Sequence, residues 1–252
     1  MDIYLFTGYS RCDLINKFAE HDWNLRAVVV PNNGKYLNKM NDLIRMCIQK
    51  GIPVTTTTNL KNDKDFELKV SGSVLYSSGY PLMLKENLFS RFKYAVNCHP
   101  TLLPKYRGKY LEYILLNDES FSGTTIHHID QGCDSGPIVI QEKYAVDFND
   151  NVHSLLKKSY AAELKLLDQV LSNPDTLNYR TTQQECESST YIKSRTPDDS
   201  EVSSSLNLVE AYKKSRAFND DIYPGFFRYK GFKIVFKMDL VAEEKNMCGE
   251  DD

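Results

Sequence analysis

Short apolar runs alternate with helical patterns along the first hundred residues of this chain. Four runs have the length and composition of buried strands, at residues 3–7, 25–31, 72–80 and 94–97. Amphipathic patterns at 10–21, with Ser10 as the N-cap, at 36–51 and at roughly 82–90 predict the helices between them. Strands that alternate with helices form βαβ units, in which a parallel sheet is covered on both faces. The sequence therefore predicts an α/β protein with a Rossmann-like, mostly parallel sheet.

The second half begins with two further strands and one long helix. Residues 123–130 and 136–146 have strand character and flank the turn "DQGCDSG". Leucines at helical spacing predict a helix over 152–172. A polar connector rich in Ser and Thr follows, and after it we expect a short helix at 206–218 and a β-hairpin at 225–238.

The composition restricts the partners and the compartment. The net charge is −3 with no basic half, so a nucleic-acid partner has no electrostatic footprint. No apolar run approaches the ~20 residues that span a bilayer, and the start "MDIYLFTGYSRCD" lacks the pattern of a signal peptide. Six cysteines without a C-x-x-C pair favour free thiols in a reducing compartment. We therefore expect a cytoplasmic protein that binds neither nucleic acid nor membrane.

An amide, an imidazole and a carboxylate are predicted to meet at one edge of the sheet. Asn97 and His99 lie at the end of one expected strand, in "AVNCHPTLLPKYRG", and Asp134 lies in the turn "DQGCDSG". Ligands of an open parallel sheet bind at the carboxyl ends of its strands. Alternation along the strand puts Asn97 and His99 on one side and Cys98 on the other. An amide can stabilise an oxyanion, an imidazole can move a proton and a carboxylate can orient it, which suits acyl transfer without a protein nucleophile.

Residue type and position alone leave the function open. A single histidine beside a strand end is more often a satisfied or exposed residue than a catalytic one, and an aspartate in a Gly-rich turn is more often a turn residue. Cys98 beside His99 suggests a thiol nucleophile, but strand alternation favours a core position for it. His127 and His128 do not form a metal-binding pair, because adjacent strand residues diverge.

Two segments resemble the motifs of the formyltransferases that use 10-formyltetrahydrofolate. "NCHPTLLPKYRG" and "GTTIHHIDQGCDSGPIV" follow the patterns N-x-H-P-S-L-L-P-x-Y-R-G and T-I-H-x-I-D-x-G-x-D-x-G, in the family's order and spacing. Thr101 stands in place of the usual Ser, and Leu111 in place of the Pro often found after the Arg–Gly pair. The resemblance implies a catalytic domain over residues 1–190 and a small C-terminal region over 191–252.

The same resemblance assigns roles to individual residues. It implies that Asn97, His99 and Asp134 are the catalytic trio, that His127 supports them, and that no metal takes part. It also implies contacts to the folate donor, from side chains after the third strand and from the backbone of the turn: Leu82, Met83, Leu84, Asp130 and Gly132. For the three apolar side chains, simple core packing is an equal alternative.

The C-terminal segments resemble those of sugar N-formyltransferases. "YIKSRTPDDSEV" and "SRAFNDDIYPGFF" match the K-R-x-P-E-D and R-A-…-Y-P-G-A-F segments of those enzymes, and the tRNA enzyme carries a related version. The resemblance implies an acceptor amine on a dTDP- or UDP-linked 4-amino-4,6-dideoxyhexose that serves surface polysaccharide assembly. Cations and aromatic rings are available to bind its diphosphate and its base, namely Arg107, Lys109, Arg216, Tyr223 and Phe226. For Tyr223 and Phe226, simple packing of the small hairpin is the alternative.

Three other functions remain open, together with the oligomeric state. The alternatives are a formyltetrahydrofolate hydrolase, a methionyl-tRNA formyltransferase-like enzyme and a non-catalytic folate- or nucleotide-binding relative. We expect no larger basic C-terminal domain of the kind that the tRNA enzyme carries, which disfavours that alternative. Because a two-stranded ribbon is barely stable alone, the aromatic-rich hairpin at 225–238 predicts a homodimer.

Overall fold

The computed structural model describes residues 1–32, 34–62, 70–108, 111–180, 196–218 and 223–241. Its centre is a seven-stranded sheet in the order β3-β2-β1-β4-β5-β6-β7. The strands are β1 Asp2–Thr7, β2 Asn24–Val30, β3 Val54–Thr56, β4 Val74–Ser78, β5 Tyr94–His99, β6 Phe121–His128 and β7 Ile138–Ala145. The first five are parallel, whereas β6 runs antiparallel to both β5 and β7. The prediction of a mostly parallel α/β sheet is confirmed.

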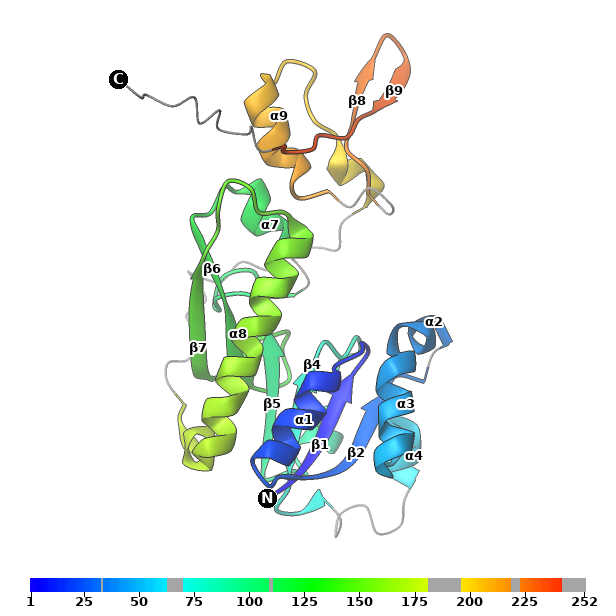
Figure 1. The fold of residues 1–252 in the computed structure, drawn as a ribbon, viewed down its shortest axis with the longest axis vertical. Helices are drawn as coiled ribbons and strands as arrows, with labels where there is room; N and C mark the ends of the chain where they lie inside the picture. Colours follow the sequence, from blue (N-terminus) through cyan, green and yellow to red (C-terminus); the bar gives the residue numbers. More distant parts are fainter. Residues whose placement is uncertain (33, 63–69, 109–110, 181–195, 219–222, 242–252) are drawn as a thin grey trace, which may run out of the picture.

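Helices cover both faces of the sheet (Figure 1). On one face lie α1 Cys12–Glu20, α3 Asn41–Lys50 and α8 Val152–Ser172, and their apolar side chains share one core with the strands. On the other face, Leu60 of α4 Thr57–Asn62 and Leu88 of α6 Glu86–Phe89 pack against a second cluster. Burial of both faces explains why the inner strands are near-continuous apolar runs.

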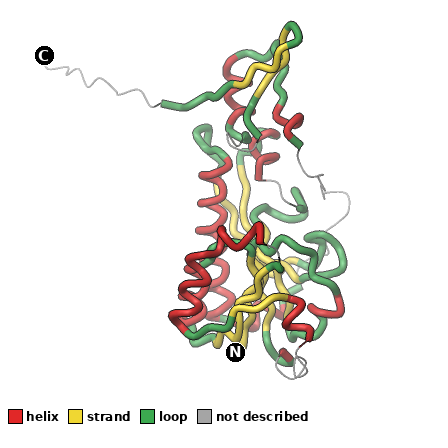
Figure 2. Tube along the Cα trace, turned by 90° about the vertical axis from the view of Figure 1, so that its right-hand side faces the viewer, coloured by secondary structure: helices red, strands yellow, loops and turns green. Residues whose placement is uncertain are grey.

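The last part of the chain forms a small C-terminal unit, which we define as residues 196–218 and 223–241 (Figures 1 and 2). It contains the short helix η4 Pro197–Ser200, α9 Leu208–Ser215 and the hairpin of β8 Phe226–Tyr229 and β9 Phe232–Val235. A third core cluster joins it to the sheet domain: Tyr106, Leu111, Ile114, Leu115, Val152, Leu155, Val202, Ala217 and Phe218. The C-terminal unit is therefore packed onto the sheet domain through a shared core.

The structure corrects several details of the expected elements. The helix expected over 36–51 is divided into α2 Gly34–Leu37, the 3-10 turn η1 Asn38–Met40 and α3. Ser10 does not cap α1, because the helix begins one residue later and the Ser10 hydroxyl lies 3.6 Å from the Cys12 sulfur. The expected domain boundary at residues 190/191 falls outside the described residues and stays a prediction. Within the described ranges, none of the helices combines the length and the apolar character that a membrane span requires.

Candidate active site

The end of β5 carries the amide and the imidazole that the sequence predicts there. Asn97 and His99 point to one side of the strand, because both contact Asp134, whose Oδ1 lies 3.2 Å from Asn97 Nδ2. Cys98 between them is buried in the core on the α8 side. Burial there, with the Glu163 carboxylate close by, raises the pKa of the Cys98 thiol well above its usual value. A thiolate nucleophile at Cys98 is therefore disfavoured.

The turn between β6 and β7 aims Asp134 at these groups. Asp134 has a φ of 49°, in the left-handed region that Asp and Asn tolerate best among residues with side chains. Asp130 holds the turn, since its Oδ1 accepts hydrogen bonds from Gly132 N at 3.0 Å and from the Ser135 hydroxyl at 2.7 Å. A Cβ on Gly136 would lie 1.9 Å from the His128 carbonyl oxygen, so only glycine fits there. These local constraints fix where the Asp134 carboxylate points.

Four polar groups converge on the Asp134 carboxylate. Gly108 N–H donates to Oδ2 at 2.9 Å and Asn97 Nδ2 donates to Oδ1 at 3.2 Å. His99 Nδ1 lies 3.4 Å from Oδ2, and His127 Nε2 lies 3.5 Å from Oδ1. Burial alone would raise the pKa of this carboxyl, but the two histidines and the Gly108 N–H hold it well below its usual range. Asp134 is therefore an anion at neutral pH.

The contacts of His99 identify its titrating nitrogen. Nε2 lies 2.8 Å from the carbonyl oxygen of Tyr106, and because a carbonyl only accepts, Nε2 carries a proton. Nδ1, which faces Asp134, is therefore the nitrogen that gains or loses a proton. His99 is 3% exposed, and this burial lowers its pKa, while Asp134 and the Tyr106 carbonyl oppose the shift. A neutral imidazole beside a carboxylate is suited to accept a proton at Nδ1.

His127 and Asn97 complete the cluster. His127 Nδ1 donates to the carbonyl of His128 at 2.8 Å, which leaves Nε2 to accept from Asn97 Nδ2 at 3.2 Å. The Asn97 amide is therefore held by both His127 and Asp134. To donate to a substrate oxygen, it must exchange one of these two contacts.

The two segments expected to bind folate are neighbours. Gln131 Nε2 of the turn donates to Glu86 Oε2 of α6 at 2.7 Å, which joins the turn to the segment after β4. Leu82 and Met83 in that segment are 50% and 63% exposed, so they are not core residues. Leu84 instead packs against the second core cluster. An apolar surface facing solvent beside the turn fits a flat aromatic ligand such as a pterin.

Residues predicted to bind the acceptor have mixed outcomes. Phe226 is fully buried, with Lys233 Nζ 3.7 Å from its ring centre, so its ring is not available to stack on a base and that prediction is wrong. Arg216 is also buried, and its guanidinium bonds to Asp118 and to three backbone carbonyls rather than facing a ligand. Arg107 and Tyr223 are half-buried. Lys109 lies outside the described residues.

The sequence missed three groups that shape this site. The Tyr106 carbonyl and the Gly108 N–H belong to the backbone, and side-chain chemistry gives no signal for either. Glu119, which accepts a hydrogen bond from the Tyr106 hydroxyl at 2.6 Å, lies far along the chain in a turn without a motif. Among the residues the structure describes, no group of three or more His, Cys, Asp and Glu is arranged to hold a metal ion.

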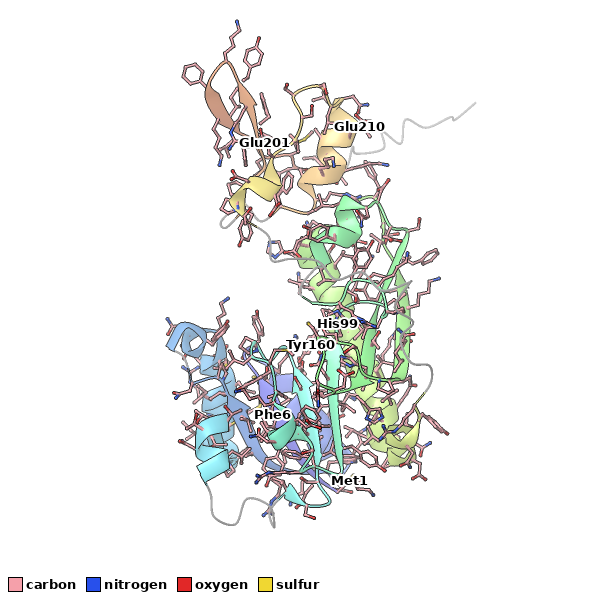
Figure 3. The ribbon with its side chains drawn as sticks, turned by 180° about the vertical axis from the view of Figure 1, so that it is seen from behind. Met1, Phe6, His99, Tyr160, Glu201 and Glu210 are labelled. Atoms are coloured by element: carbon pink, nitrogen blue, oxygen red, sulfur yellow. The ribbon has the colours of Figure 1, made fainter. Side chains whose placement is uncertain are left out.

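The position of the cluster in the molecule is visible in Figure 3. His99 lies at the end of β5, on the side of the sheet domain that is nearer to the C-terminal unit, which carries Glu201 and Glu210; Phe6 and Met1 lie farther from that unit.

Comparison with known sequences gives a family match and relatives that are covered to different extents. Residues 13–171, more than half of the chain, match the formyl transferase family. A methionyl-tRNA formyltransferase from Caldicellulosiruptor saccharolyticus is 28% identical over 259 residues, which cover 98% of this chain and 82% of the relative. Two further relatives are longer, and the matches cover 56% and 31% of their lengths.

Solved structures share the fold over nearly the whole chain. A 4-N formyltransferase from Francisella tularensis has a TM-score of 0.73 at 20% identity, and the match covers 96% of this chain and 98% of that one. An N-formyltransferase from Helicobacter canadensis, crystallised with folinic acid and dTDP-3-aminofucose, has a TM-score of 0.70 at 20% identity and covers 92% and 85%. At this identity the likeness establishes the fold, including that of the C-terminal unit.

Proposed function

Because this chain belongs to the formyl transferase family, we propose that it transfers the formyl group of 10-formyltetrahydrofolate to the amine of a nucleotide-linked amino sugar. The observation that carries the proposal is the contact of Asn97, His99 and Asp134 at the carboxyl edge of the sheet. Asn97 supplies a hydrogen-bond donor for the oxyanion, His99 a proton acceptor and Asp134 a fixed negative charge. No protein nucleophile is needed.

The reaction balances with these groups alone. The acceptor amine attacks the formyl carbon, a new C–N bond forms, and the bond from that carbon to the folate nitrogen breaks. Asn97 donates to the carbonyl oxygen as negative charge develops on it. His99 Nδ1, backed by Asp134, accepts the proton that the amine loses and then passes it to the departing folate nitrogen, so that the imidazole ends the reaction neutral.

The surface beside the trio supports a folate donor. Leu82 and Met83 present apolar side chains to solvent next to the turn that carries Asp130 and Gly132. A pterin stacked there would bring its formyl group toward the end of β5. Folinic acid, which is bound in the Helicobacter canadensis relative, is a formylated folate, and this supports the same donor here.

Two lines support a nucleotide-sugar acceptor. The full-length likeness to a 4-N formyltransferase extends through the C-terminal unit, and the Helicobacter canadensis relative holds dTDP-3-aminofucose. Arg107 and Tyr223 are the described candidates to bind the diphosphate and the base. We assign the acceptor to a dTDP- or UDP-linked 4-amino-4,6-dideoxyhexose that is used in the cytoplasm for surface polysaccharide assembly.

A second candidate acceptor is the amino group of methionyl-tRNA. It is favoured by the relative from Caldicellulosiruptor saccharolyticus, which matches 98% of this chain. A net charge of −3 disfavours it, because tRNA binding requires many cationic contacts to phosphate.

One assay with a panel of acceptors tests these candidates. The full chain is incubated with 10-formyltetrahydrofolate and a panel of dTDP- and UDP-linked 3-amino and 4-amino sugars, methionyl-tRNA, or buffer alone. A formyl mass gain on a nucleotide sugar is the expected result. Formylation of methionyl-tRNA alone would replace the proposal with the tRNA function, and release of formate without any acceptor would indicate a hydrolase.

A further inference from the structure

The turn that follows α7 Leu111–Leu116 lies between the C-terminal unit and the loop that holds His99. It consists of Asn117, Asp118 and Glu119, and Asp118 has a φ of 51°. In this left-handed conformation, successive side chains leave the turn in different directions. Asn117 and Glu119 reach the loop, whereas Asp118 reaches the C-terminal unit.

Asn117 and Glu119 both form hydrogen bonds with the hydroxyl of Tyr106. The hydroxyl donates to Glu119 Oε1 at 2.6 Å and accepts from Asn117 Nδ2 at 2.9 Å. The Tyr106 ring is 7% exposed, and its φ of 57° turns its carbonyl toward the catalytic cluster. That carbonyl accepts the proton of His99 Nε2 at 2.8 Å. Fixing the Tyr106 side chain therefore also fixes the imidazole.

Asp118 ties the same turn to the C-terminal unit. Its Oδ1 accepts from Arg216 Nη2 at 3.1 Å, and its Oδ2 pairs with Lys213 of α9. Arg216 is 6% exposed; its Nη1 donates to the carbonyls of Asp147 and Phe148 at 3.0 and 3.2 Å, and its Nε donates to the carbonyl of Lys213 at 3.3 Å. Ala217 and Phe218, directly after Arg216, pack in the same core cluster as Tyr106.

We propose that Asn117, Asp118 and Glu119 are positioning residues. They couple the packing of the C-terminal unit against the sheet domain to the orientation of His99. The contacts run from Arg216 to Asp118, through the turn to the Tyr106 hydroxyl, and from the Tyr106 carbonyl to His99 Nε2. The proposal rests on the proposed function of His99. In it the C-terminal unit supports catalysis, in addition to any contact that it makes with the acceptor.

The first test removes one hydroxyl. Tyr106→Phe keeps the ring in the cluster but loses the bonds to Asn117 and Glu119. Because a small misplacement of a reacting group can cost ~100-fold in rate, we expect kcat to fall about tenfold with little change in KM. Tyr144→Phe is the matched control, since Tyr144 packs against the same cluster from β7. It is expected to keep the wild-type kcat.

The pH profile separates positioning from a loss of folded protein. The groups that face His99 are Asp134, His127 and the Tyr106 carbonyl, and this carbonyl favours the protonated imidazole. When its contact with Nε2 loosens, the pKa of His99 falls further, so the acidic limb of the kcat profile of Tyr106→Phe should move to lower pH. A smaller fraction of folded enzyme would scale the profile without moving it.

A double-mutant cycle tests the coupling to the C-terminal unit. Asp118→Asn keeps a residue that tolerates positive φ but removes the charge that Arg216 and Lys213 face. We expect a fall in kcat of about threefold, and a double variant with Tyr106→Phe that is no slower than the slower single variant. The proposal would be overturned if the fold-reductions in kcat of the two single variants multiplied in the double variant. It would also be overturned if either folded single variant kept the wild-type kcat. His99→Asn is assayed in parallel: if it also keeps its turnover, the proposed function fails, and if it alone is inactive, only the coupling fails.

Discussion

Replacing Asp134 by Asn removes one half-buried negative charge and one of the two oxygens that accept hydrogen bonds from Asn97 and Gly108. Asn tolerates the φ of 49° at this position, and its Oδ1 can still accept from the Gly108 N–H. The charge matters because His99 Nδ1, 3.4 Å from the carboxylate, becomes cationic when it accepts the amine proton. Two unit charges ~4 Å apart interact by about 4 kcal/mol at an effective dielectric of ~20. Since about 1.4 kcal/mol corresponds to one pKa unit, the base would lose up to ~3 units of proton affinity.

The expected kinetic result follows from this loss. With the proton only partly transferred in the transition state, kcat should fall by roughly 100- to 1,000-fold, within the range known for general acid–base catalysis. Formylated product is quantified by mass spectrometry, and circular dichroism with a thermal melt reports the fold. Asp168→Asn is a matched control, because Asp168 lies 2.9 Å from His21 Nε2 on the surface, outside the site. A folded Asp134→Asn enzyme with turnover within about threefold of wild type would refute the role of this carboxylate.

Three further predictions concern the thiol, the pH dependence and the assembly. Cys98→Ala should keep most of its turnover, since the Cys98 side chain faces the core; a folded but inactive variant would require a thiol mechanism. Burial lowers the pKa of His99, so as pH falls below about 6.5 this histidine is protonated in the unfolded chain before it is protonated in the folded one. The free energy of unfolding, measured with urea, should therefore fall between about pH 7 and pH 5. That slope should be shallower in His99→Gln, and an equal slope would contradict the assignment. We also expect a homodimer through the exposed face of the hairpin, with a dimer mass by light scattering at micromolar concentration that Phe232→Glu converts to a monomer mass; a wild-type monomer would refute it.

The sheet was predictable from the sequence where its strands are long and buried. The runs that became β1, β2, β4 and β5 each contain at least three consecutive apolar residues, because helices cover both faces of the sheet. β3 was missed, since it has three residues, two of them threonine, and lies at the edge of the sheet. The break between α2 and α3 was missed as well, because the amphipathic pattern continues across η1. Local patterns therefore identified the central strands but not the short peripheral elements.

The site was predictable in its side chains and not in its backbone. A motif and the rule on strand ends were enough to expect Asn97, His99 and Asp134 together. No residue type indicates that the Tyr106 carbonyl meets His99 Nε2, because that contact depends on a positive φ. The expectation that Phe226 and Arg216 bind the acceptor was wrong for a related reason. An aromatic ring and a guanidinium suit a ligand and a core equally, and only the packing of the C-terminal unit decides between them.

This packing determines how the choice of acceptor can be assigned to residues. Removing the chain beyond residue 196 would take Val202, Ala217 and Phe218 out of the cluster that surrounds Tyr106. Such a deletion would disturb the support of His99 together with any acceptor contact, so a loss of sugar binding could not be attributed to the C-terminal unit alone. Arg107 and Tyr223 do not belong to that cluster, and both are half-buried rather than buried. Single substitutions at these two positions therefore separate recognition of the acceptor from positioning of the catalytic histidine.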